Sequence, residues 1–425
     1  MSKKIILIII AVLIIVGAII GGIYFFKDKT VTPTTTTTTD SGYKPFNPFG
    51  GSGGTNSNTT TDGQVESNVT QTAKFYRITD FSIAGATFYQ DKKVLTTTME
   101  SAVSNPQIDP KTQKPIPPVV KFDLVPSLRY VERASGHIYN MDIPTKTENK
   151  ISVSTIPGIY EALFNKDANT VIYRYLSDDR KSINSFMTTL GGAKGEFLPI
   201  NILGISTSLD KSKFFYLLEN GGGVIGLTRS FDKSDKFQVF TSSFTEWIPQ
   251  WINDSKVFLT TKASASVEGN LFSLDIKSGT LKKVVGGIYG LTTLSNSDGS
   301  KVLYSSSLSS GPKLYIFNLK DNSTTNINNY GLPEKCVWSK NDINIYCAIP
   351  NTIQGTQYPD SWYQGLISFN DKFIKIDAIS GGVSNIINSE EVTAVDATNL
   401  FLSDSEEQLF FTNKKDSTLW GLNLY

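Results

Sequence analysis

The sequence predicts an all-β protein, a β-propeller of about seven blades, on the strength of three observations. A turn phrase recurs along the chain at nearly constant spacing, as in "SNSDGSKVLYSSS" at 295–307. Apolar and polar residues alternate with a period of two around each turn, which is typical of strands. The last repeat is one strand short, and a spare strand precedes the first repeat, which predicts closure into a ring.

The recurring phrase places an acidic residue in a tight polar turn between two strands. Asp, Asn, Gly and Ser supply the backbone geometry of such turns. The acidic residues of five successive phrases are 43 or 44 positions apart, and a looser copy follows: Asp167, Asp210, Asp254, Asp298, Asp342 and Asp404. A four-stranded blade needs ~40 to 45 residues, so each phrase is interpreted as the first two strands of one blade.

First strands are expected at seven places along the chain. They lie near Phe81, Tyr160, Ile202, Trp247, Leu291, Cys336 and Asn399. Six or eight blades remain open as alternatives, because a Pro-rich insertion at 104–120 makes the first blade irregular.

The last blade is one strand short. Its final segment, 408–425, supplies a second and a third strand but no fourth. The segment "KFYRIT" at 74–79 is a strand without a blade of its own. Pairing the two would remove an exposed sheet edge, so we expect residues 73–425 to form a propeller with a closing strand near 74–79.

Residues 1–29 are predicted to be an N-terminal transmembrane anchor. Residues 5–26 form an uncharged apolar run of 22 residues, close to the ~20 that cross a bilayer as a helix. A cleavable signal peptide is the alternative, but its apolar region is typically only ~7 to 15 residues long. Lys3 and Lys4 precede the run and slightly favour a cytoplasmic N-terminus. The sequence therefore predicts a single-pass membrane protein whose propeller is extracytoplasmic.

Residues 30–72 are predicted to be a disordered linker. This segment consists largely of Thr, Gly, Ser and Asn and has almost no aliphatic side chains. Such a composition cannot bury enough apolar surface to offset the entropy lost on ordering.

Composition and motifs argue against several function classes. With 40 basic and 39 acidic residues the formal net charge is +1, which makes a nucleic-acid partner unexpected. Two Cys and one His fall short of a structural zinc site, so no metal is expected. His137 would have to serve any Ser-His-Asp mechanism, yet no G-x-S-x-G motif is present. We expect no cofactor, no catalytic residue and no enzyme activity.

The two cysteines, Cys336 and Cys347, flank one predicted turn. If Asn341 and Asp342 form that turn, the cysteines lie opposite one another on paired strands, at a separation that a disulfide can bridge. A disulfide and a pair of core thiols both remain open.

One loop-like stretch, 351–365, interrupts the sixth blade and is rich in aromatic residues. Tyr358, Trp362 and Tyr363 lie there among turn residues. Aromatic side chains on a loop that rigid sheets support suit recognition of a partner. We therefore predict that these three residues bind a partner; the alternative is that they fold back and cover the propeller face.

Several phrases resemble the WD-repeat-like blades of TolB-type propellers. "WSKNDINIYC", "SNSDGSKVLY" and "LFSLDIKSG" are similar to the W-S-P-D-G-x-x-I-x-[FY] pattern of those blades. Together with the anchor and the linker, "RYVERASGHIYNMD" and "LPEKCVWSKND" resemble a family of membrane-anchored propeller proteins of candidate-phylum bacteria. Most repeats here lack the Pro and Gly of the TolB pattern, so a Tol-like role rests on analogy of fold.

The expected function is that of an extracytoplasmic binding or scaffolding module. Such a propeller would recognise a protein, peptide or glycan of the cell envelope. The alternative is an envelope hydrolase or lyase that uses carboxylates in the propeller channel.

Overall fold

The computed structural model describes residues 73–94, 111, 121–192, 195–232, 235–308 and 310–425. The predicted anchor and linker, 1–72, lie outside the described residues, as does most of the Pro-rich insertion. No helix within the described part is long and apolar enough to span a membrane.

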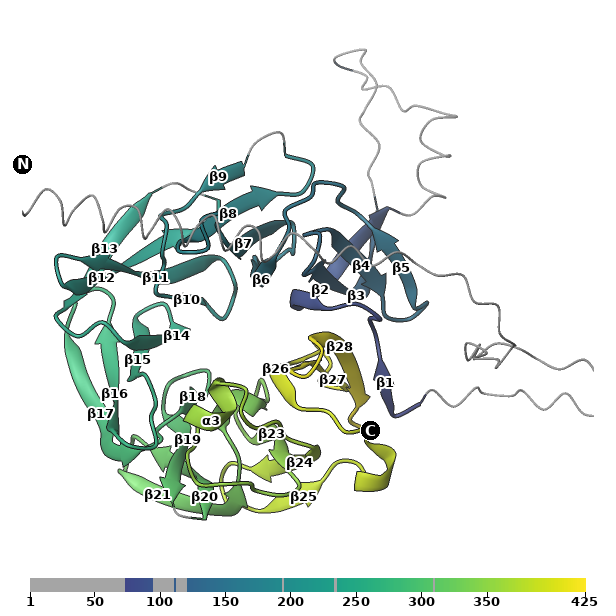
Figure 1. The fold of residues 1–425 in the computed structure, drawn as a ribbon. Helices are drawn as coiled ribbons and strands as arrows, with labels where there is room; N and C mark the ends of the chain where they lie inside the picture. Colours follow the sequence, from purple (N-terminus) through teal and green to yellow (C-terminus); the bar gives the residue numbers. More distant parts are fainter. Residues whose placement is uncertain (1–72, 95–110, 112–120, 193–194, 233–234, 309) are drawn as a thin grey trace, which may run out of the picture. The chain divides into compact units, whose positions relative to one another are not determined.

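The described chain forms seven four-stranded antiparallel sheets, arranged as the blades of a propeller (Figure 1). This confirms the all-β class and the count of seven blades. Blades 1 to 3 comprise β2 (Ile83–Val94), β3 (Phe122–Glu132), β4 (Ile138–Asp142) and β5 (Thr147–Lys150); β6 (Ile159–Phe164), β7 (Thr170–Leu176), β8 (Ile183–Thr189) and β9 (Gly195–Phe197); and β10 (Gly204–Thr207), β11 (Lys213–Asn220), β12 (Gly223–Ser230) and β13 (Lys236–Ser242).

The next three blades follow in chain order, and blade 6 carries the short helical elements η1 (Pro333–Lys335) and α3 (Asp360–Tyr363). Blades 4 to 6 comprise β14 (Trp247–Asn253), β15 (Lys256–Thr261), β16 (Glu268–Asp275) and β17 (Leu281–Tyr289); β18 (Thr293–Ser295), β19 (Lys301–Leu308), β20 (Gly311–Asn318) and β21 (Ser323–Tyr330); and β22 (Cys336–Trp338), β23 (Asn344–Pro350), β24 (Asp371–Asp377) and β25 (Val383–Asn385). A short 3-10 turn, η2 (Ser389–Glu391), leads into blade 7.

Blade 7 joins the two ends of the described chain. Its strands are β26 (Ala397–Leu402), β27 (Gln408–Asn413), β28 (Thr418–Asn423) and β1 (Phe75–Arg77). β1 lies within the predicted closing segment and pairs with β28, with Phe75 opposite Leu422. The ring of Phe75 lies 5.2 Å from that of Trp420 in blade 7 and 5.8 Å from that of Phe373 in blade 6. Backbone pairing and aromatic packing together close the ring.

The repeated turn owes its geometry to its Asp or Asn side chain. Asp210 accepts a hydrogen bond from the backbone N–H of residue 212 at 3.1 Å, Asp298 accepts one from residue 300 at 2.8 Å, and Asn341 accepts one from residue 343 at 3.1 Å. In each turn the next residue has positive φ, a conformation that such turns often require. The repeat in the sequence is therefore a repeated turn structure.

The hydrophobic core lies between neighbouring blades. In β11, Phe214 and Tyr216 pack against blade 2, whereas Phe215 and Leu217 pack against blade 4. Successive side chains of a strand point to opposite faces, and both faces of this strand are buried. The second strands consequently have almost continuous apolar sequences, and the blades form one rigid scaffold.

Candidate functional site

The cysteines lie opposite one another in blade 6. Cys336 on β22 is the register partner of Cys347 on β23, and a disulfide of 2.08 Å joins their sulfur atoms. Both side chains lie in the apolar core between blades 5 and 6. The hairpin turn at Asn341 and Asp342 produces this register.

We expect the double substitution Cys336→Ala and Cys347→Ala to lower the free energy of unfolding by about 2 to 3 kcal/mol, because the disulfide restricts the unfolded chain. Urea unfolding measures this loss. A reducing agent should destabilise the wild-type protein to a similar extent and leave the double variant unaffected. Unchanged wild-type stability on reduction would contradict the disulfide.

The aromatic loop does not present its side chains as the sequence suggested. Residues 351–370, here called the cap, connect β23 to β24. Tyr358 is 0% exposed and Trp362 is 4% exposed, and both pack with Leu332 and Phe369. The prediction that Tyr358 and Trp362 bind a partner directly is therefore corrected, because their rings form the cap's own core. Tyr363 is 39% exposed, and its hydroxyl donates a hydrogen bond to Glu334.

A buried lysine lies beneath the cap. The side chain of Lys335 is fully buried, and its ammonium group lies 2.8 Å from a carboxylate oxygen of Asp371 and 2.5 Å from one of Asp396. It also donates a hydrogen bond of 2.8 Å to the backbone carbonyl of Ala397. These contacts join η1 of blade 6 to the segment that enters blade 7.

Trp362 connects the cap to the buried cluster of Lys335, Asp371 and Asp396. Its indole N–H donates a hydrogen bond of 2.9 Å to Asp396. The Lys414 ammonium lies 4.4 Å from the centre of the indole ring and donates to the backbone carbonyl of Trp362. In the same short helix, α3, Asp360 accepts a 2.6 Å hydrogen bond from the backbone N–H of Ala265 in blade 4. The cap is thus fastened to blades 4, 6 and 7.

The pKa values of the two buried carboxyl groups, Asp371 and Asp396, are shifted in opposite directions. Burial raises the pKa of Asp371 to about 6, although the Lys335 ammonium acts in the opposite direction. Burial also acts to raise the pKa of Asp396, but the Lys335 ammonium and the hydrogen bonds from Phe369 and Trp362 lower it overall. Both side chains are buried, at 2% exposure for Asp371 and 0% for Asp396. Both oxygens of Asp396 and the Oδ2 atom of Asp371 are bonded within the protein, whereas the buried Oδ1 atom of Asp371 has no hydrogen-bond partner among the described residues.

The raised pKa of Asp371 predicts that stability depends on pH. Unfolded aspartate titrates near 3.8, so between about pH 4 and pH 6 the folded protein holds a proton that the unfolded chain has released. The free energy of unfolding should therefore contain a contribution that decreases as pH rises through this window. Urea unfolding of wild type and Asp371→Asn should show this contribution in the wild type alone. Asp321→Asn, which removes an exposed turn carboxylate, serves as control and should retain it.

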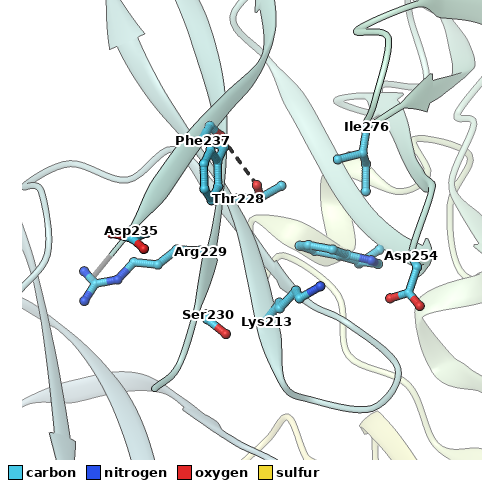
Figure 2. Close-up of a pocket in the computed structure, with 9 residues that line it drawn as sticks. Lys213, Thr228, Arg229, Ser230, Asp235, Phe237, Asp254 and Ile276 are labelled. Carbon is cyan, nitrogen blue, oxygen red and sulfur yellow. Dashed lines mark hydrogen bonds between the residues drawn. The ribbon is translucent and has the colours of Figure 1, made fainter. Parts of the chain in front are cut away.

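A second candidate site lies between blades 3 and 4, where a cleft has a volume of about 300 Å³. Figure 2 shows the cleft and eight labelled residues of its lining. The lining residues are Lys213, Thr228, Arg229, Ser230, Asp235, Phe237, Trp251, Asp254 and Ile276.

Strand register explains which side chains of blade 3 face blade 4. Lys213 is paired with Ser230, and Thr228 is paired with Phe237, so these four side chains share one face of the sheet. Arg229 alternates to the opposite face, where its guanidinium group contacts Glu196 of blade 2 at 2.6 and 3.0 Å. Figure 2 shows Arg229 extending in the direction opposite to Lys213.

Blade 4 supplies the opposite wall. The Trp251 ring is buried in the core between blades 3 and 4, and its N–H donates to the carbonyl of Asn253 at 2.8 Å. Asp254 follows in the turn between β14 and β15, and Ile276 follows β16. A fixed indole, a turn carboxylate and an aliphatic side chain therefore face the Lys213 side of blade 3.

Three charged side chains of the cleft have no partner within the described part of the chain. Lys213, Asp235 and Asp254 are exposed, and none of these side chains makes an ion pair or hydrogen bond with a described residue. In Figure 2 the Lys213 ammonium points toward the side of the cleft that carries Asp254. Phe237 exposes 65% of its surface at the rim. The cleft can thus offer charge of both signs and an aromatic ring.

Sequence reasoning missed this cleft because its residues come from two blades and seven separate strands or connecting segments. Asp254 was identified only as a turn residue of the repeat. The one available signal was an aromatic residue, Phe237, in an outer strand that is otherwise polar at its exposed positions. Among the described residues, no group of three or more His, Cys, Asp and Glu side chains is placed to hold a metal ion.

Comparison with known proteins gives structural neighbours but no family and no curated relative. No family model matches the chain, and no curated protein matches it in sequence. Solved structures that are similar to this chain include an oligogalacturonate lyase in complex with manganese. Its sequence identity is 9% over 81% of this chain and 99% of that chain, and the TM-score is 0.49. TolB from Acinetobacter baumannii has 12% identity over 70% and 76%, with a TM-score of 0.39.

The β-propeller domain of the Trilobed protease from Pyrococcus furiosus is a further structure of this kind. It shares 9% identity over 71% of this chain and 92% of that chain, with a TM-score of 0.47. These likenesses concern the fold alone. The seven four-stranded sheets make the described chain a seven-bladed β-propeller, and TolB is among its structural neighbours.

Proposed function

We propose that this protein is a membrane-anchored binding module of the cell envelope. Its propeller lies outside the cytoplasm and captures a protein, peptide or glycan at the cleft between blades 3 and 4. The observation that carries the proposal is the pair of opposite charges, Lys213 and Asp254, which line a 300 Å³ cleft and have no partner among the residues that the structure describes. A rigid cleft with a few convergent polar groups and an exposed aromatic ring is typical of binding sites.

The cleft is a better candidate for the binding site than the cap, because most aromatic rings of the cap are buried. Tyr358 and Trp362 have almost no exposed surface, so a partner has no access to their rings. The alternative of a hydrolase or lyase with channel carboxylates receives no support from Asp371 and Asp396, because both side chains are buried and both are paired with Lys335.

The proposed topology rests on the apolar run at 5–26 and the polar segment at 30–72. Protease added to intact cells should cut within 30–70 and release the propeller into the medium. Cleavage that occurs only after lysis would contradict the outward orientation.

Capture of a partner tests the role of the cleft. Full-length wild-type protein would be crosslinked in intact host membranes and compared with Phe237→Ala and Phe197→Ala. The control is closely matched, because Phe197 is 66% exposed on the outer strand of blade 2. We expect the crosslinked partner to be lost in Phe237→Ala and kept in Phe197→Ala. Equal capture by all three proteins would contradict binding at the cleft.

A further inference from the structure

The charges of the cleft constrain the chemistry of its ligand. Lys213 lies on blade 3 and Asp254 on blade 4, so a ligand between the blades meets a cation on one wall and an anion on the other. The blade 3 wall has two further charged residues, Asp235 and Arg229. Asp235 is exposed and adds a second carboxylate to the lining, whereas Arg229 is directed to the opposite face and contacts Glu196. A neutral ligand would leave both Lys213 and Asp254 without a counter-charge, whereas a ligand with both charges would pair with each.

The apolar part of the cleft adds a second requirement. The Phe237 ring is largely exposed, and the half-buried Ile276 contributes further apolar surface. An apolar side chain on the ligand would remove this surface from water at about 25 cal/mol per Å². The hydroxyl group of Ser230 on the same face offers an additional hydrogen-bonding group.

The volume of the cleft limits the size of the ligand that it can enclose. A volume of about 300 Å³ is at the lower end of the range for small-molecule sites, ~300 to 1,000 Å³. It matches one or two amino-acid residues and is too small to enclose a folded partner.

We propose that the cleft binds the zwitterion of an apolar amino acid or a short unblocked peptide. The ligand's carboxylate pairs with Lys213, its ammonium group pairs with Asp254, and its side chain contacts Phe237. This assignment rests on the proposed function, because it names the ligand class of the same site.

Titration calorimetry on the full-length protein in detergent tests the assignment. The probes are L-phenylalanine, L-leucine and L-leucyl-L-leucine at up to millimolar concentration, with N-acetyl-L-phenylalanine and L-phenylalaninamide as analogues that lack one charge each. We expect at least one zwitterion to bind, and each single-charge analogue of phenylalanine to bind at least about tenfold more weakly than phenylalanine, a difference of 1.4 kcal/mol.

Single-residue variants test which protein side chain pairs with each charged group of the ligand. Asp254→Asn should weaken binding of the zwitterion about tenfold and leave the affinity for N-acetyl-L-phenylalanine unchanged, since that analogue has no ammonium group. Lys213→Met should show the reverse pattern, with the affinity for L-phenylalaninamide unchanged. Lys236→Met is the matched control, because its register partner is Arg229 and its side chain lies on the opposite face of blade 3. It should bind as the wild type does.

The outcomes separate the two proposals. Absence of binding by every zwitterion, or equal affinity for zwitterions and blocked analogues, overturns the ligand assignment. If the crosslinked partner still depends on Phe237 in that case, the proposed function stands and only the ligand class fails. If crosslinking is also independent of Phe237, both fail.

Discussion

Lys335→Met should lower the free energy of unfolding by about 3 to 5 kcal/mol, which is a large fraction of the stability of a typical domain. The substitution leaves the carboxylates of Asp371 and Asp396 buried without their shared cation. The size of the loss therefore reflects an uncompensated buried charge more than the loss of a favourable pair. Urea unfolding of the purified protein measures it.

Two further variants test whether the buried charges cause the loss of stability in Lys335→Met. Lys340→Met removes an ion pair with Asp404 in which both side chains are more than half exposed, and it should cost less than about 1 kcal/mol. Adding Asp371→Asn and Asp396→Asn to Lys335→Met removes the two unpaired buried carboxylates and should recover part of the lost free energy of unfolding. If Lys335→Met and Lys340→Met had equal effects, the buried cluster would not be the element that fastens the cap.

Phe75→Ala should destabilise the propeller by about 3 kcal/mol, because the ring lies at the junction that closes the blades. It contacts the rings of Phe373, Phe411 and Trp420 at centroid distances of 5.8, 5.9 and 5.2 Å. The strand that carries it pairs with β28 over three residues only. Thermal unfolding followed by circular dichroism measures the effect.

The control for this variant is Phe122→Ala. Phe122 is 52% exposed on β3, so its truncation should change stability by no more than about 0.5 kcal/mol. Losses of similar size in the two variants would contradict a specific role of the closing strand.

The blades were predictable because their signal is local and repeated. Asp210 and Asp298 close their turns within a few residues, and the same chemistry returns every 43 or 44 positions. The opposition of Cys336 and Cys347 also follows from the position of one turn. A strand period of two and a turn residue suffice for such inferences.

The cap was only half predictable, because its stability comes from distant residues. The sequence showed that Trp362 lies in an insertion with turn residues. It did not show that Asp396 would accept a hydrogen bond from the indole N–H across 34 positions, or that Lys414 would lie against the ring. The environment of an aromatic side chain in a loop depends on such tertiary contacts and not on local pattern.

The cleft was not predictable from pattern at all. Lys213, Phe237 and Asp254 occupy positions that are ordinary in their own strands and turns, and they face one another only once blades 3 and 4 are packed together. Thr228 and Arg229 alternate to opposite faces of the sheet, so Thr228 faces blade 4 whereas the guanidinium group of Arg229 contacts Glu196 of blade 2.

The most direct measurement of the central proposal is photocrosslinking from within the cleft in intact cells. A photoactivatable benzoylphenylalanine would replace Phe237 in one full-length protein and Phe197, which is equally exposed, in another. The account predicts a discrete adduct from position 237 that an excess of the zwitterionic ligand suppresses, and no such adduct from position 197. Adducts of equal yield from both positions, or none from position 237, would contradict a binding role for the cleft.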